Sequence, residues 1–111
     1  MNYLMLVCVD ESVKLSKAEW ATMTAEVKAW VAGMDASGVR LLGNQLAPAS
    51  DATTVRVRDG EVLLGDGPFA ETKEQIAGFD LIECADLDQA IEVASKHPVA
   101  RFGALQVRPY I

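Results

Sequence analysis

Residues 3–9, Tyr-Leu-Met-Leu-Val-Cys-Val, are apolar at every position. A strand with one face in water alternates apolar and polar residues, so this run predicts a strand that is covered on both faces and central in its sheet. The run is too short to span a membrane, and it lacks the basic flank and cleavage site of a signal peptide. The rest of the fold must therefore cover both sides of this strand.

Two helices are predicted from their start and stop signals. Ser16 and Glu19 have the spacing of a capping box, and Gly38 supplies the stop of the first helix. Asp86 is the expected N-cap of the second helix, and Pro98 ends it. Apolar residues recur at helical spacing in both segments. They are Trp20, Met23, Val27, Trp30, Val31 and Met34 in the first helix and Leu87, Ala90, Ile91 and Ala94 in the second.

The remaining regular segments read as strands. They are Val39–Leu46, Thr53–Arg58, Glu61–Leu64, Ile76–Cys84 and Gly103–Arg108. Asp59-Gly60 predicts a two-residue hairpin turn that sets Arg58 opposite Glu61 and Val57 opposite Val62.

The element order is βαβ, a hairpin, then βαβ, and it predicts an α+β, ferredoxin-like fold. Crossovers of the same hand place both helices on one face of an antiparallel four-stranded sheet. The first strand is apolar on its open side as well, and a second copy of the chain is the simplest cover for that side. We therefore expect a homodimer formed through the sheet face.

Length and charge limit the classes of function. A chain of 111 residues is the size of one domain, expected over residues 1–111, and its formal net charge of −6 disfavours nucleic acids and anionic membranes as partners. Cys8 and Cys84 lie in apolar segments, with a spacing that suits neither a zinc site nor a disulfide framework. We expect a reduced, cytoplasmic protein without a metal or another cofactor.

A rigid turn follows the predicted hairpin. Gly67 accepts backbone angles closed to other residues, and Pro68 fixes its own φ, so Phe69 is expected to insert into apolar surface beside a ligand. Asp66 and Glu71 are the candidate catalytic residues for proton transfer. The alternative is that both carboxylates accept backbone hydrogen bonds in the turn, or that Glu71 pairs with Lys73, and a structural role is favoured for Asp66.

Three further charged residues are candidates for a site. Asp80 falls within a predicted central strand, where a carboxylate is costly unless it has a partner or faces a wet pocket. Arg108 on the last strand could pair with Asp80 or hold an anionic ligand, and both roles stay open. His97 is the only histidine, and its expected role is a charge at the negative end of the second helix rather than catalysis.

The run Asp66–Glu74, Asp-Gly-Pro-Phe-Ala-Glu-Thr-Lys-Glu, resembles the DGPF group of YCII-related proteins, as do Gly78-Phe79, Leu87-Asp88 and Val107-Arg108-Pro109. The resemblance covers nearly the whole chain. It implies a ferredoxin-like fold that pairs as a dimeric α+β barrel, with a shallow pocket beside the sheet. It also implies similarity to lactone isomerases and dehalogenases, and an association of many members with alternative sigma factors.

Three departures from the family pattern bear on function. YCII proteins resemble one another in a histidine on the first helix that pairs with an aspartate, but residues 16–37 contain no histidine. Phe102 stands where relatives often carry a histidine, and Asp80 replaces a more typical apolar residue. Two hypotheses follow: a small-molecule protein with isomerase-like or lyase-like proton transfer, or a non-catalytic regulatory or interaction module. Neither the ligand nor enzymatic activity follows from the sequence.

Overall fold

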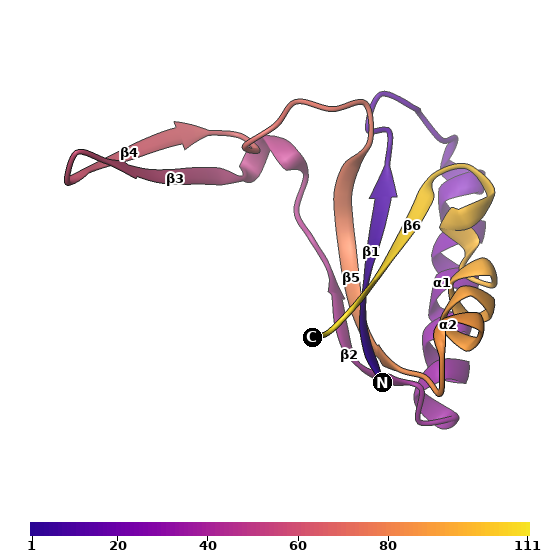
Figure 1. The fold of residues 1–111 in the computed structure, drawn as a ribbon. Helices are drawn as coiled ribbons and strands as arrows, with labels where there is room; N and C mark the ends of the chain where they lie inside the picture. The colour runs from indigo at the N-terminus through magenta and orange to yellow at the C-terminus, as the bar shows by residue number, and fades with distance from the viewer.

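The computed structural model of the chain describes residues 1–111 and has two layers, a sheet and a pair of helices (Figure 1). The sheet has the strand order β2-β5-β1-β6, and every neighbouring pair is antiparallel. This is the predicted ferredoxin-like arrangement, with the apolar strand β1 at the centre. The strands are β1 (Asn2–Val9), β2 (Arg40–Gln45), β5 (Gln75–Glu83) and β6 (Ala104–Pro109).

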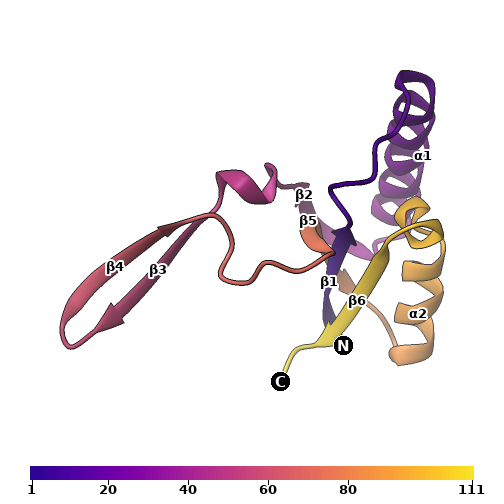
Figure 2. The ribbon, with the colours of Figure 1, turned by 90° about the horizontal axis from the view of Figure 1, so that it is seen from above.

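Both helices lie on one face of this sheet, as predicted (Figures 1 and 2). Helix α1 (Lys17–Ala36) begins with the predicted capping box between Ser16 and Glu19. Helix α2 (Leu87–Ser95) begins at Asp86, whose side chain accepts a hydrogen bond from the Gln89 backbone N–H. Neither helix is both long enough and apolar enough to cross a bilayer.

The core lies between the helices and the sheet. Tyr3, Met5 and Ile82 are its largest fully buried side chains, and they come from the two central strands. Trp30 of α1 is buried in the same core, whereas Trp20, ten residues earlier in the helix, is 53 % exposed. The other buried apolar residues are Val7, Cys84, Ala90, Val93, Ala94 and Val99.

Strands β3 (Thr53–Arg58) and β4 (Glu61–Asp66) form a separate two-stranded sheet, here called the arm. Its turn has the predicted form, with positive φ angles of 52° at Asp59 and 79° at Gly60. The predicted pairing of Arg58 with Glu61 and of Val57 with Val62 is confirmed. The arm extends away from the main sheet on the side opposite to the helices (Figures 1 and 2).

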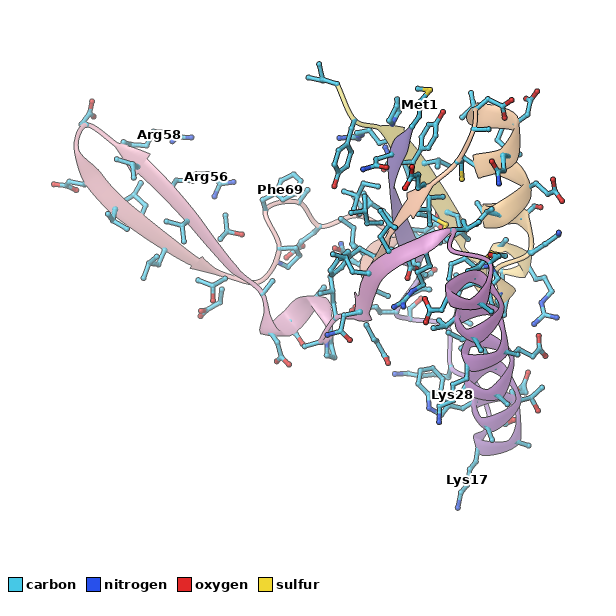
Figure 3. All side chains as sticks on the ribbon, turned by 90° about the horizontal axis from the view of Figure 1, so that it is seen from below. Met1, Lys17, Lys28, Arg56, Arg58 and Phe69 are labelled. Carbon is cyan, nitrogen blue, oxygen red and sulfur yellow. The ribbon has the colours of Figure 1, made fainter.

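Two hydrogen bonds fix the base of the arm. Gly67, at a φ of 91°, donates its N–H to the carbonyl of Ala52 at 2.7 Å. The carbonyl of Gly67 accepts a hydrogen bond from the Thr54 hydroxyl at 2.9 Å. The prediction that Phe69 inserts into apolar surface of its own chain is wrong, because its side chain is 78 % exposed. It lies at the base of the arm, between the arm and the main sheet (Figure 3).

Two short 3-10 helices complete the connections. One of them, Ala49–Asp51, links β2 to the arm. The other, Pro98–Arg101, follows α2 and leads into β6.

Candidate functional site

A cavity of about 840 Å³ lies between α1 and the helix-facing side of the sheet. We call it the helix–sheet cavity. Apolar side chains of α1, among them Met23, Val27 and Val31, form one wall. Arg40, Asp80 and His97 also line it, together with other charged and polar residues, among them Asp10, Glu11, Lys14 and Lys28. A mostly apolar hollow with a few convergent polar groups is the usual form of a small-molecule site.

Asp80 is held on the helix-facing side of β5. It is paired with Met5 of β1, which is fully buried, and is itself only 6 % exposed. Its Oδ1 accepts a hydrogen bond from Nε of Arg40 at 2.7 Å. Burial raises the pKa of Asp80, and the bond from Arg40 offsets part of that rise. The same bond raises the pKa of Arg40, so the guanidinium stays charged.

A β-bulge in β2 brings Arg40 to the face that carries Asp80. Arg40 pairs with Ile82 and Leu42 pairs with Leu81, so Leu41 is an extra residue without a partner in β5. Gly43 then pairs with Asp80. Arg40 and Gly43 are three positions apart, and in a regular strand they would point to opposite faces of the sheet. The bulge places both on the face that carries Asp80.

Gly43 makes room for the ion pair. A Cβ atom at this position would lie 2.6 Å from the carbonyl oxygen of Phe79 and would also collide with the Asp80 carboxylate. Its third neighbour would be Nη2 of Arg40 at 2.9 Å. Only glycine therefore fits opposite Asp80 while the Arg40 bond is made.

His97 is buried and neutral, so its predicted role as a charge at the end of α2 is wrong. The residue is 4 % exposed, and burial lowers the pKa of its imidazole to about 4. Its Nδ1 accepts a hydrogen bond from the Val99 backbone N–H at 3.1 Å, which begins the 3-10 helix after α2. The ring contacts Trp30 edge to face, with 4.8 Å between the ring centroids.

Two polar atoms in the helix–sheet cavity have no partner in the protein. The Nδ1 of neutral His97 accepts a hydrogen bond, so the proton lies on Nε2, which makes no bond to the chain. Oδ2 of Asp80 likewise has no partner, because Arg40 bonds only Oδ1. Every fully buried side-chain nitrogen and oxygen has a hydrogen-bond partner, so neither of these two atoms is fully buried. Among the largely buried residues of the lining, Nε2–H of His97 is thus a free donor and Oδ2 of Asp80 a free acceptor.

A second hollow, of about 520 Å³, lies beside the turn that follows the arm. Glu71 lines it together with Asp10 and Lys73, so this candidate catalytic residue faces a hollow. Asp66 does not line it, because Asp66 ends β4 and pairs with Thr53 at the base of the arm. The structure thus separates the two carboxylates that the sequence placed in one candidate site, and their catalytic roles stay predictions.

Arg108 lies on the other face of the sheet from Asp80. It pairs with Leu4 of β1, whereas Asp80 pairs with the next residue, Met5. Neighbouring residues of a strand point to opposite faces, so the suggested pair between Asp80 and Arg108 does not form. The partner of Asp80 is Arg40. Arg108 remains a candidate for holding an anion on the exposed face.

The sequence reading missed Arg40 and Gly43. One signal was available for the glycine, since a glycine inside a strand often marks a close approach of another group or a bulge. No local signal identified Arg40, because its position depends on the bulge and on the pairing with a distant strand. No group of three or more His, Cys, Asp or Glu side chains is placed to hold a metal ion.

The fold and the cavity define a small α+β protein of the ferredoxin-like class. The YCII-related domain model matches residues 1–111, and the chain belongs to this family. An uncharacterized protein of Rhizobium meliloti (strain 1021), R00369, is 48 % identical over 67 residues, which cover 59 % of this chain and 54 % of that protein. The match thus spans about half the length of that relative.

A solved structure shares the fold. It is 5-chloro-2-hydroxyhydroquinone dehydrochlorinase (TftG) from Burkholderia phenoliruptrix AC1100, in complex with 2,5-dihydroxybenzoquinone. The similarity covers 100 % of this chain and 94 % of that chain, with a TM-score of 0.51 and 14 % sequence identity. At this identity the comparison supports the fold alone.

Proposed function

We propose that the chain binds a small organic molecule with oxygen substituents in the helix–sheet cavity and exchanges protons with it. The observation that carries this proposal is the convergence of Arg40, Asp80 and His97 on one cavity. A buried carboxylate is costly to a fold, and its retention beside an open hollow is typical of functional sites.

Each of the three polar groups has a distinct part in the proposal. Oδ2 of Asp80 is the proton acceptor, and burial makes it a stronger base than an exposed aspartate because it raises the pKa. Nε2–H of neutral His97 donates to a carbonyl or hydroxyl oxygen of the ligand. Arg40 holds the carboxylate in one orientation from Nε at 2.7 Å. Proton transfer next to a carbonyl requires such a base and donor.

The volume and the apolar wall of the cavity support a ring-shaped ligand, and the molecule bound by the fold relative is the first candidate to test. A volume of about 840 Å³ lies within the usual range for ligand sites, and the apolar wall of α1 suits a flat ring. The dehydrochlorinase with the same fold binds 2,5-dihydroxybenzoquinone, a flat ring with hydroxyl and carbonyl groups. We therefore take dihydroxylated quinones and related phenols as the first class of ligand.

Titration calorimetry with 2,5-dihydroxybenzoquinone tests this proposal. We expect saturable binding to the wild type and at least about tenfold weaker binding to Asp80→Asn, which corresponds to the loss of one hydrogen bond to a charged group. The matched controls are Glu71→Gln in the second hollow and Arg108→Gln on the opposite face, and both should bind like the wild type. If Asp80→Asn binds 2,5-dihydroxybenzoquinone as tightly as the wild type does, the proposal for the helix–sheet cavity is contradicted. Weaker binding by Glu71→Gln alone would contradict it as well.

We further propose that two copies of the chain pair through the open face of the sheet, as a dimeric α+β barrel. Leucine side chains of the two central strands lie opposite each other on this face, with Leu4 paired to Leu81. Leu6 pairs with Phe79 on the same face. Since the helices cover only the other face, a second sheet is the cover that this apolar surface fits.

A further inference from the structure

The arm carries an apolar face that nothing in the chain covers. Paired residues of an antiparallel ribbon point to the same side, and Val55 pairs with Leu64 while Val57 pairs with Val62. All four side chains therefore share one face. Their exposed fractions are 60 % for Val55, 56 % for Val57, 64 % for Val62 and 71 % for Leu64.

The other face of the arm is largely polar. Arg56 pairs with Leu63, and Arg58 pairs with Glu61, so charged side chains dominate this side. Arg56 and Arg58 project from the arm into solvent (Figure 3). An alternation of this kind is typical of a sheet with one face buried and one face wet. A two-stranded ribbon alone is marginally stable in water, so the apolar face indicates a missing contact.

The arm points away from its own sheet and does not fold back to cover its apolar face (Figures 1 and 2). Its base is fixed by the bond from the Gly67 N–H to the Ala52 carbonyl and by the bond from Thr54 to Gly67. Both ribbon views show the arm directed away from the helices and from the sheet (Figures 1 and 2). Gly67 of the family motif thus anchors an outward-pointing ribbon.

A second copy of the chain is the occupant that this geometry fits. The arm projects on the open-face side of the sheet, where the partner sheet of the proposed dimer would stack. Stacked sheets lie about 10 Å apart, and a strand of six residues spans about 20 Å, so the arm is long enough to pass the partner's sheet layer. Phe69, exposed between the arm and the sheet, lies where the partner would enter (Figure 3).

We propose that the arms are exchanged in the dimer, so that each lies along the other copy with Val55, Val57, Val62 and Leu64 against it. The interface is then isologous, because the same arm and the same receiving surface occur once on each copy. This inference rests on the proposed sheet-face dimer and is independent of the ligand. In this arrangement the turn that begins at Gly67 has a structural role, because it holds the arm in the direction of the other copy.

The adjacent residues Val62 and Leu63 provide a matched test, since they lie on opposite faces of the same strand. In sedimentation velocity experiments, we expect Val62→Asp to raise the dimer dissociation constant at least about tenfold, as removal of a central interface contact does. Leu63→Asp, which places a carboxylate beside Arg56, should change it less than about twofold. Circular dichroism checks that both variants are folded.

The outcomes separate the two proposals. A monomeric wild type at micromolar concentration overturns both the dimer and the arm exchange. A dimer that Val62→Asp and Leu63→Asp leave equally tight overturns the exchange alone. A photoreactive residue at position 62 of the otherwise unchanged chain gives a second readout. A covalent dimer supports the exchange, whereas cross-links only within the chain or to a different protein overturn it.

Discussion

Arg40 and Asp80 are joined across strands β2 and β5 by a hydrogen bond of 2.7 Å from Nε to Oδ1. Both side chains are largely withdrawn from water, with exposed fractions of 15 % and 8 %. The guanidinium also bonds Asp35 near the end of α1, at 3.1 Å from Nη1 to Oδ1. Arg40 therefore links the sheet to the helix layer at the edge of the helix–sheet cavity.

Removal of Arg40 should leave Asp80 as an uncompensated buried charge. We expect Arg40→Gln to lower the free energy of unfolding at pH 7 by about 3 kcal/mol, measured by urea denaturation. Asp35→Asn removes only the half-exposed partner and should cost less than about 1 kcal/mol. If Arg40→Gln lowers the free energy of unfolding no more than Asp35→Asn does, the buried bond from Arg40 to Asp80 does not stabilise the fold as described.

The pH dependence of the Arg40→Gln variant gives a second check. Burial raises the pKa of Asp80 and the arginine lowers it, so loss of Arg40 raises the pKa further above the unfolded value. In this variant the Asp80 carboxyl binds a proton more readily in the folded state than in the unfolded state. The free energy of unfolding therefore falls as pH rises from the unfolded pKa through the folded pKa of Asp80. The cost of Arg40→Gln relative to wild type should therefore be smaller at pH 4 than at pH 7. The Arg40→Gln, Asp80→Asn double variant should lose this dependence.

A side chain at position 43 should disrupt the ion pair. Gly43→Ala places a Cβ atom 2.6 Å from the Phe79 carbonyl oxygen and against the Asp80 carboxylate, so we expect a loss of about 2–3 kcal/mol in thermal or urea unfolding. Gly33→Ala is the matched control, because nothing lies within 4 Å of its added Cβ in α1. That substitution should stabilise the protein by up to about 1 kcal/mol. Equal effects at the two positions would be inconsistent with the packing described for Gly43.

Protonation of His97 should destabilise the protein in mildly acidic solution. Burial lowers its pKa from 6.5 to about 4, so between these values the unfolded chain binds a proton that the folded chain does not. Stability is thus lost as pH falls from 6.5 to 4. His97→Asn keeps a short acceptor for the Val99 N–H but does not titrate. Urea unfolding of both proteins should show a steeper fall for the wild type over this range, and parallel curves would refute a buried neutral imidazole.

Local signals in the sequence predicted the elements and their connections. The capping box at Ser16, the N-cap at Asp86 and the Asp59-Gly60 turn each depend on residues a few positions apart, and all three are confirmed. The element order then led to the ferredoxin-like fold, because few topologies accommodate two crossovers of the same hand.

The site was harder to predict because it depends on contacts between distant segments. The partner of Asp80 is set by a bulge at Leu41, which shifts the register by one residue. Because of this shift, Arg40 points to the same face of the sheet as Asp80 instead of the opposite face. The charge state of His97 follows from burial beneath Trp30, which the sequence near position 97 does not reveal. Phe69 is apolar but exposed, which is consistent with contact to a second copy rather than to its own chain.

The central claim is that a small molecule binds between α1 and the sheet, in contact with Asp80 and His97. Chemical-shift mapping of the labelled protein with 2,5-dihydroxybenzoquinone tests it most directly. We predict saturable shifts at Met23, Arg40, Asp80 and His97, which line the helix–sheet cavity. Shifts confined to the turn around Glu71, or the absence of any saturable shift with this ligand, would contradict the claim.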